Sequence, residues 1–230
     1  MQGVLLVDKP AGWTSFDAVN YVRKLVARAE GKKPKQIKAG HTGTLDPFAT
    51  GLLVLLIGKA YTKRAGELSK LDKTYEVTME LGKTSSTGDP EGDITAISDT
   101  VPPEAAVLEA LKGFRGTIQQ VPPAYSAVKI DGQRAYKLAR AGKEVVIEPR
   151  TVTVNRLELA GYDYPEVRLV TDVSSGTYIR SLVEDIGKQL GNGAYTTGLR
   201  RTKVGKYGIK EAYSPKTLTA EQLERVLTEL

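Results

Sequence analysis

The segment of this sequence that is best suited to chemistry is a glycine-rich stretch at residues 40–51, which reads GHTGTLDPFATG. Its three glycines allow tight or positive-φ turns. Pro47 disfavours the helical conformation for the preceding residue, so we expect the backbone of Asp46 to be extended. Such a loop can hold a carboxylate in a fixed position, where it could act as a nucleophile or a base. The alternative is that Asp46 only caps a turn.

Other kinds of reactive site fit the sequence less well. Gly51 and Gly58-Lys59 resemble a P-loop, but six residues separate the glycines instead of four, and Ala60 stands where Ser or Thr is required. A Ser-His-Asp hydrolase would have to use His41, the only histidine, and no Gly-x-Ser-x-Gly motif is present. The absence of cysteine excludes disulfides, cysteine-held metals and thiol nucleophiles.

Metal binding is also disfavoured. The acidic turn at residues 88–93, GDPEGD, invites a calcium interpretation, but its spacing does not match an EF-hand loop. The composition leaves only Mg²⁺ held by carboxylates as a possible metal. We therefore expect neither a metal nor a cofactor.

The charge of the chain favours a polyanionic partner. There are 33 Lys and Arg residues against 27 Asp and Glu, which gives a net charge of +6. Basic residues gather near the C-terminus and in residues 119–150, where two tyrosines accompany them: Arg200, Arg201, Lys129, Arg134, Lys137 and Arg140. Both groups suit phosphate backbones, and the alternative is a solvated surface. With no signal-peptide pattern and no apolar run long enough to cross a bilayer, we expect a cytoplasmic protein.

Hydrophobic patterns place strands and helices around these residues. Strands are predicted at residues 3–8, 52–57 and 74–81 and around 152–157 and 167–173, with Tyr75 on the buried face of its strand. Helices are predicted after a cap at Thr14 or Ser15, with Phe16 on the apolar face, and at residues 103–111 and 177–190, with Tyr178 and Arg180 in the first turn of the latter. A last helix is predicted to open with the capping box of Thr219 and Gln222. The interspersed elements indicate an α+β fold with a mixed sheet.

Taken together, the motifs resemble the TruB family of tRNA pseudouridine synthases, in order and along nearly the whole chain. The matching stretches are DKPAGWTS at 8–15, GHTGTLDP at 40–47, KTY at 73–75, VPPAYSA at 121–127, SGTYIR at 175–180 and LRR at 199–201. The resemblance implies the pseudouridine synthase fold, an α+β fold with a mixed, mostly antiparallel central sheet flanked by helices. It also implies one catalytic domain over residues 1–230, with residues 119–150 as an inserted RNA-gripping thumb. The additional C-terminal RNA-binding domain of many relatives is expected to be absent.

The implied activity is isomerisation of the uridine at position 55 in the T loop of tRNA, after the base has been flipped out. Asp46 would be the catalytic carboxylate, and Arg180 would pair with it and keep it ionised. Whether Asp46 attacks C1′ of the ribose, attacks C6 of uracil or assists proton removal at C2′ stays open. No membrane and no protein partner are implied, and we expect a monomer that binds tRNA.

The remaining site residues also take their roles from the resemblance. Tyr75 would stack on the target uracil, and Tyr178 would donate or accept a hydrogen bond beside Asp46. His41 would fill the gap that the flipped base leaves, and Leu199 would help to wall the uracil site. Lys9 and Pro10 would support the catalytic loop.

Two other functions compete with this hypothesis. A noncatalytic RNA-binding protein or RNA chaperone could use the same fold, although a pure binder has no need of a carboxylate facing RNA phosphates. The second is the guide-RNA-dependent branch of the same enzyme superfamily. Incubating the protein alone with unmodified tRNA would separate the three.

Overall fold

In the computed structural model, which describes residues 1–126, 128–130, 132–143 and 145–229, the chain separates into two units. Ala127, the last residue of the VPPAYSA motif, lies outside the described residues. Unit 1 comprises Met1–Tyr75 and Arg200–Leu230, and unit 2 comprises Glu76–Leu199. Strands β4 (Lys73–Leu81) and β12 (Ala194–Val204) run from one unit into the other. The single domain expected from the sequence stays a prediction.

Unit 1 is built on two hydrophobic strands, β1 (Gly3–Lys9) and β3 (Thr50–Ile57). They pair antiparallel from Gly3 opposite Ile57 to Lys9 opposite Gly51, and nearly all their side chains are buried. The short strand β2 (Ala39–His41) also pairs antiparallel with β3. The end of β12 lies parallel to the start of β3, and β13 (Tyr207–Gly208) pairs with β12. The predicted strands at residues 3–8 and 52–57 are thereby confirmed.

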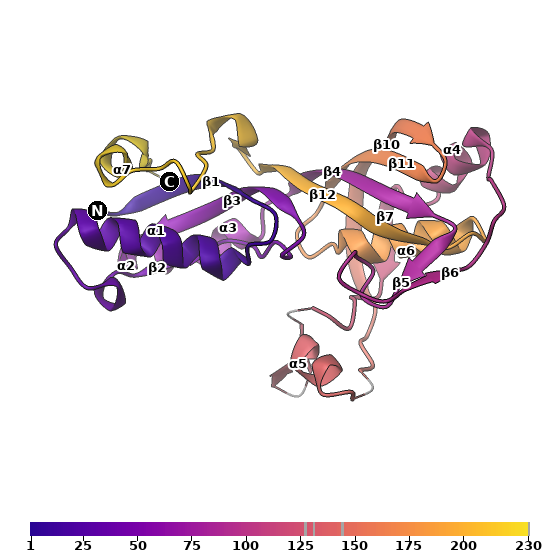
Figure 1. Cartoon of the computed structure of the whole chain (residues 1–230), viewed down its shortest axis with the longest axis horizontal. Coiled ribbons are helices and arrows are strands. Elements are labelled where there is room, and N and C mark those ends of the chain that lie inside the picture. Colours follow the sequence, from indigo (N-terminus) through magenta and orange to yellow (C-terminus); the bar gives the residue numbers. More distant parts are fainter. Residues whose placement is uncertain (127, 131, 144, 230) are drawn as a thin grey trace. The chain divides into compact units, whose positions relative to one another are not determined.

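Helices cover the strands of unit 1 (Figure 1). Helix α1 (Ser15–Ala29) begins at the predicted position, because Thr14 caps it and forms a capping box with Asp17. Its buried positions include Val19, Val22 and Val26. The prediction that Phe16 belongs to the same apolar face is wrong, since 59% of this residue is exposed. The shorter helices are η1 (Pro34–Gln36), α2 (Lys59–Thr62), α3 (Ala65–Ser69), η2 (Ile209–Glu211) and α7 (Ala220–Val226).

Unit 2 contains a sheet in which the strands follow the order β12, β4, β11, β10, β7. Strand β10 (Arg150–Asp163) pairs antiparallel with both β11 (Glu166–Val173) and β7 (Gly116–Gln120). The alternation predicted for β4 is confirmed, because Val77, Met79 and Leu81 are buried on one side. A separate hairpin joins β5 (Lys83–Ser85) to β6 (Ile94–Ala96).

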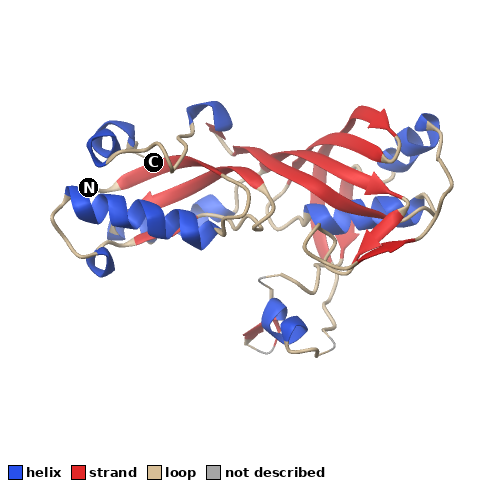
Figure 2. Ribbon diagram, in the orientation of Figure 1, coloured by secondary structure: helices blue, strands red, loops and turns tan. Residues whose placement is uncertain are grey.

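Two helices belong to this sheet, and a small lobe is inserted between β7 and β10 (Figure 2). Helix α4 (Glu104–Lys112) confirms the helix predicted at residues 103–111, but Pro103 is its cap and not part of its first turn. Helix α6 (Ile179–Gln189) buries Leu182, Val183 and Ile186 but begins after Tyr178, so the prediction that Tyr178 lies in its first turn is wrong. The lobe comprises β8 (Lys129–Ile130), β9 (Gln133–Arg134) and α5 (Ala135–Arg140). The mixed, mostly antiparallel sheet with its helices confirms the predicted α+β fold.

Candidate active site

Asp46 lies in a loop of unit 1, residues 42–49, which we call the Asp46 loop. The loop connects β2 to β3, whose pairing continues through a hydrogen bond from the Thr42 N–H to the Val54 carbonyl, at 3.1 Å. Within the loop the Ala49 N–H donates to the Asp46 carbonyl at 3.2 Å. Asp46 itself is half-buried, whereas Leu45 and Ala49 are buried. The loop therefore carries a partly accessible carboxylate between two buried apolar anchors.

Ser15 holds the residue that precedes Asp46. Its hydroxyl accepts a hydrogen bond from the Leu45 N–H at 2.8 Å and donates one to the Leu45 carbonyl at 3.1 Å. Ser15 is only 3% exposed, so water does not compete for these bonds. The first residue of α1 thereby fixes the backbone beside the carboxylate. Sequence reasoning missed this role, although Ser15 belongs to the DKPAGWTS motif.

Arg201 anchors the first part of the Asp46 loop from inside unit 1. Its guanidinium donates to the carbonyls of Leu52 at 2.7 Å, Gly43 at 3.1 Å and Thr44 at 3.4 Å, and the residue is 2% exposed. A buried guanidinium with these acceptors does not present its charge to a phosphate on the surface. The structure thus corrects the prediction that Arg201 contacts the RNA backbone.

The contact between β3 and β12 at this point requires a glycine. Gly51 has φ +102° and lies opposite Arg201 in the parallel ladder. A Cβ on Gly51 would lie 2.3 Å from the Arg201 carbonyl oxygen, which is closer than any side chain can approach. One of the three glycines singled out in the sequence therefore allows the close approach of two strands.

Lys9 anchors the other side of the Asp46 loop. This side chain is fully buried, and its Nζ donates to the carbonyls of Trp13 at 2.6 Å and Pro47 at 3.3 Å, as well as to that of Pro10. The Gly12 N–H also donates to the Pro47 carbonyl at 2.9 Å. These bonds tie Pro47, the residue after Asp46, to the segment that follows β1. The supporting role that the resemblance implies for Lys9 stays a prediction.

His41 and Tyr75 also belong to unit 1. His41 ends β2 and is half-buried; burial and the positive charge of Arg201 lower the pKa of its imidazole. Both effects favour the neutral form of the ring. Tyr75 lies in β4 and is 7% exposed. Its proposed stacking on uracil remains a prediction.

Lys73 is a buried cation that sequence reasoning did not single out. It is 9% exposed, and its Nζ donates to the carbonyls of Ser69 at 2.9 Å and Leu71 at 2.5 Å. Burial, and then the nearby charge of Arg201, lower the pKa of Lys73 to about 8. Its only sequence signal is its place in the KTY motif.

Arg200, the neighbour of Arg201, has a different environment. Its guanidinium makes a two-pronged ion pair with Asp8, with Nη1 to Oδ1 at 3.1 Å and Nη2 to Oδ2 at 2.7 Å. About a third of each side chain is exposed. This pair holds the end of β1 to β12, and a phosphate contact by Arg200 stays a prediction.

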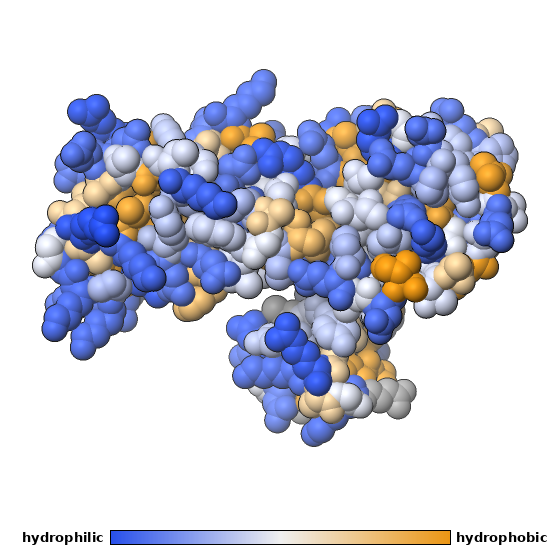
Figure 3. Space-filling view, viewed as in Figure 1, coloured by the Kyte–Doolittle hydropathy of each residue, from blue (hydrophilic) through white to orange (hydrophobic). Residues whose placement is uncertain are grey.

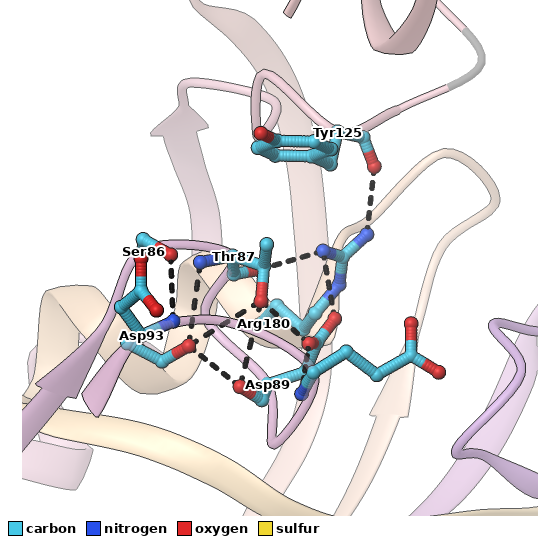
Figure 4. Close-up of polar contacts among 8 residues, drawn as sticks. Ser86, Thr87, Asp89, Asp93, Tyr125 and Arg180 are labelled. Carbon is cyan, nitrogen blue, oxygen red and sulfur yellow. Dashed lines mark hydrogen bonds and ion pairs between the residues drawn. The ribbon is translucent and has the colours of Figure 1, made fainter. Parts of the chain in front are cut away.

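In unit 2, Arg180 is the centre of a buried polar network (Figure 4). The residue is 4% exposed, and Nη1 donates to the Thr87 carbonyl at 2.7 Å and to Asp89 Oδ2 at 3.1 Å. Nη2 donates to the Tyr125 carbonyl at 2.9 Å. These contacts fix the guanidinium in one orientation and connect α6 to two segments that are distant in the sequence.

Asp89 is the carboxylate partner of Arg180 within this unit. Its Oδ1 accepts from the Thr87 hydroxyl at 2.6 Å and from the Glu91 N–H at 3.0 Å. A cation in the first turn of a helix is repelled by the positive end of the helix dipole. The negative charge of Asp89 compensates for this repulsion. The residue lies in the acidic turn at residues 88–93, for which the only site considered from the sequence was a calcium site, which the spacing disfavours. The pairing of Arg180 with Asp46 stays a prediction.

The end of β7 and the residue that follows it are hydrogen-bonded to the start of α6. The side-chain amide of Gln120, 2% exposed, accepts from the Tyr178 N–H at 2.8 Å and donates to the Tyr178 carbonyl at 3.0 Å. The Ser181 hydroxyl donates to the Val121 carbonyl at 2.9 Å. Together with the bond from Arg180 to the Tyr125 carbonyl, these bonds connect the VPPAYSA and SGTYIR segments. Tyr178 is half-buried at the helix cap.

The basic residues of the inserted lobe are exposed. Lys129 and Arg134 face each other across the β8–β9 hairpin, and Lys137 and Arg140 lie in α5. The Arg140 guanidinium lies 5.9 Å from the centre of the Tyr136 ring. Hydrophilic side chains gather on the visible face of this lobe (Figure 3). Leu199, in contrast, is 9% exposed in β12.

Two further site types find no support in the described part of the chain. Among these residues, no group of three or more His, Asp or Glu side chains could hold a metal ion. None of the described helices combines the length and the apolar character needed to span a membrane.

Comparison with solved structures places the fold. A chain in the crystal structure of a Cbf5–Nop10–Gar1 complex matches with a TM-score of 0.69 at 28% identity, over 96% of this chain and 54% of that one. A chain of an H/ACA ribonucleoprotein bound to a substrate RNA containing 2′-deoxyuridine matches with a TM-score of 0.66 at 26% identity, over 99% of this chain and 56% of that one. The present chain thus spans about half the length of these solved chains.

Comparison at the level of sequence identifies the class. The family model for the N-terminal domain of TruB family pseudouridylate synthases matches residues 31–179, and that for the tRNA pseudouridylate synthase B C-terminal domain matches residues 180–229. Together with the fold and the Asp46 loop, these matches define a pseudouridine synthase, which is an isomerase.

The chain belongs to the TruB family. It is 48% identical to a tRNA pseudouridine synthase B of Pseudomonas fluorescens over 100% of this chain and 70% of that protein. It is 47% identical to the protein of the same name from Pseudomonas aeruginosa over 100% of this chain and 71% of that protein.

Proposed function

We propose that this chain converts the uridine at position 55 of tRNA into pseudouridine and that Asp46 is the carboxylate responsible. The activity follows from membership of the TruB family and from relatives named tRNA pseudouridine synthase B that match the whole chain. The observation that supports the role of Asp46 is the anchoring of its loop by Ser15, Lys9 and Arg201. Such pre-organisation is what a reacting carboxylate requires.

The reaction needs only a base, a ribose and a carboxylate. The bond from N1 of uracil to C1′ breaks, the base turns, and C5 forms the new bond to C1′. The proton on C5 is lost and N1 gains one, so the product is an isomer of the substrate and neither water nor an oxidant is consumed. Asp46 can serve this chemistry by attacking C1′, by attacking C6 or by assisting proton removal at C2′.

Arg180 is proposed to keep Asp46 ionised when the RNA excludes water from the site. Desolvation and nearby phosphates both raise the pKa of a carboxylate, and a guanidinium opposes them. The support is that Arg180 is buried and its side chain is fixed by Thr87, Asp89 and Tyr125. A cation held in this way keeps its position and its charge throughout the reaction.

The substrate is proposed to bind as an extruded nucleotide, because its C1′ is inaccessible inside a folded T loop. Tyr75 would stack on the uracil, Leu199 would wall its site and Tyr178 would form a hydrogen bond beside Asp46. His41 would replace the extruded base, for which the neutral form of its ring is suited. The exposed cations of the inserted lobe would contact the RNA backbone: Lys129, Arg134, Lys137 and Arg140.

We further propose that the protein acts in the cytoplasm as a monomer, without a protein partner or guide RNA. Purified protein should then modify an unmodified tRNA transcript by itself. Its elution volume in size-exclusion chromatography should correspond to 24.9 kDa.

The decisive experiment compares wild type with Asp46→Asn on a transcript that carries tritium at C5 of uridine. Wild type should release tritium from position 55 only. Asp46→Asn keeps the shape of the side chain but is neither a nucleophile nor a base, so release should fall by more than about a thousandfold while RNA binding stays nearly unchanged. Activity of the variant within about tenfold of wild type would refute the role of Asp46. An inactive wild type that still binds RNA would favour a noncatalytic chaperone.

A further inference from the structure

Phe16 is an exposed aromatic side chain immediately beside the residue that holds the Asp46 loop. It follows Ser15, whose hydroxyl fixes Leu45, and 59% of Phe16 is exposed. Most buried positions of α1 lie away from Phe16 around the helix, at Ala18, Val22 and Val26, and on its own side the buried residue is Ala27, three turns further along. The packing of unit 1 therefore does not account for an aromatic residue at this position.

Arg23 accompanies Phe16 on the same side of α1. Its guanidinium carbon lies 5.8 Å from the centre of the Phe16 ring, a cation–π distance. Nη1 donates to Asn20 Oδ1 at 2.7 Å and Nη2 to the Ala39 carbonyl at 3.2 Å, so neutral groups hold the guanidinium in place. No carboxylate among the described residues forms an ion pair with it. The positive charge beside the ring is thus not neutralised.

The two residues flank both functional segments of unit 1. Phe16 adjoins Ser15, which contacts the loop that carries Asp46. Arg23 contacts Ala39, which lies two residues before His41 in β2. The exposed Phe16 ring therefore lies next to the Asp46 loop, which would receive the flipped uridine. The Arg23 cation lies next to β2, which carries His41, the proposed replacement for the flipped base.

We propose that Phe16 and Arg23 form a stacking site for a nucleotide that neighbours the flipped uridine, with its base on Phe16 and its phosphate near Arg23. This inference rests on the proposed function. Nucleotides beside an extruded base lose a stacking partner, and an aromatic side chain can replace it. The charge of Arg23 favours a nucleotide over an apolar protein surface, because a phosphate complements the guanidinium and an apolar partner would bury it.

The first test measures binding of an unmodified T stem-loop RNA in the Asp46→Asn background, where no turnover occurs. Phe16→Ala should weaken binding about tenfold, Phe16→Leu should weaken it to a similar degree, and Phe16→Trp should bind like the parent. Leu108→Ala, which removes an exposed apolar side chain from α4, serves as the matched control and should change nothing. Equal binding by Phe16→Ala and its parent would overturn the proposal.

The second test identifies the stacked base. A set of stem-loops is prepared in which each nucleotide beside the target in turn lacks its base. On one of these RNAs the difference between Phe16→Ala and its parent should disappear, while it persists on the others. A difference that persists on every abasic RNA would mean that no base stacks on Phe16, and would also overturn the proposal.

Two controls keep these results interpretable. Urea denaturation reports whether each Phe16 variant is folded, and Phe16→Trp keeps the test valid should Phe16→Ala lose stability. Binding is measured without catalysis, so an absence of pseudouridine formation by wild type would refute the proposed function without changing the outcome of the abasic series.

Discussion

The hydroxyl of Ser15 is bonded to both polar backbone groups of Leu45, accepting from the N–H at 2.8 Å and donating to the carbonyl at 3.1 Å. One buried side chain at the start of α1 thus forms hydrogen bonds with both the N–H and the carbonyl of the residue before Asp46. Helix α1 is capped and packs on the core of unit 1, so its first residue, Ser15, is held in place. The Asp46 loop, which is bonded to Ser15, is held in place with it.

Ser15→Ala should therefore damage both stability and catalysis. Two buried backbone groups of Leu45 would lose their partner, which we expect to cost about 1–3 kcal/mol in the free energy of unfolding. A loosened loop should lower the single-turnover rate by about tenfold to about a hundredfold. Urea denaturation and single-turnover assays with saturating enzyme measure the two effects.

Thr14→Ala provides the matched control. It removes the neighbouring hydroxyl, which caps α1 by accepting from the Asp17 N–H at 3.1 Å, and it should cost about 1 kcal/mol of stability. The Thr14 hydroxyl bonds within its own capping box and not to Leu45, so the single-turnover rate should stay unchanged. An equal loss of rate in both variants would show that helix stability, and not the contact to Leu45, matters for catalysis.

Lys73 should make the stability of the protein depend on pH. Its folded-state pKa is about 8, against an ordinary value of 10.5 for a lysine in an unfolded chain. Between these two values the unfolded chain binds more protons than the folded protein. The free energy of unfolding contributed by this residue must therefore rise with pH across that interval, by about 3 kcal/mol in total.

Lys73→Met removes this titration and supplies the reference. Both proteins are unfolded with urea at several values between pH 7 and pH 10.5. The free energy of unfolding of the variant differs from that of wild type by an additional constant amount, because the carbonyls of Ser69 and Leu71 lose their hydrogen-bond donor. The stability of wild type relative to Lys73→Met should be lowest below pH 8 and increase above it. A difference that does not vary with pH would contradict a lowered pKa.

The salt dependence of RNA binding tests the inserted lobe. Replacing Lys137 and Arg140 with Ala should weaken tRNA binding and reduce the slope of log K against log salt by about one unit for each phosphate that the variant no longer binds. Turnover at saturating RNA should hardly change. The control replaces Lys112 and Lys188, two exposed lysines that already pair with Glu109 and Asp185. If both double variants give the wild-type slope, the lobe is only a solvated surface.

Local patterns predicted most of the elements. The alternation along β4 and the capping signals at Thr14 and Thr219 depend on residues close in sequence, and the structure confirms all three. The motif at residues 40–51 also predicted a fixed loop. Glycine permits backbone conformations that other residues avoid, and proline restricts the residue before it, wherever in a sequence they occur.

Contacts between distant segments could not be predicted in this way. Nothing near Arg201 in the sequence indicates that the chain from Gly43 to Leu52 surrounds it, and a run of basic residues is most simply interpreted as a surface. The same holds for Asp89, which lies 91 positions from Arg180. The exposure of Phe16 was missed because helical spacing alone does not tell which side of a helix start meets the core.

The charge of Arg180 should control the ionisation of Asp46 in the RNA complex. If this guanidinium keeps Asp46 ionised, Arg180→Met should raise the pKa of Asp46 in the bound complex. The variant should be much slower at pH 7 and recover part of the loss as pH increases. Because Asp89 would lose its buried partner, the substitution should also cost about 3–5 kcal/mol of stability, so the fold must be checked at each pH.

Arg180→Lys separates charge from position. It retains a positive charge near Asp89 but cannot reproduce all the donors that reach Thr87 and Tyr125. The observable is the acid limb of the single-turnover rate against pH, with enzyme in excess so that weaker binding does not interfere. That limb should move to higher pH in Arg180→Met and stay near the wild-type position in Arg180→Lys, even where the plateau rate falls. An acid limb at the wild-type position in Arg180→Met would mean that Arg180 acts only by holding α6, Thr87 and Tyr125 together.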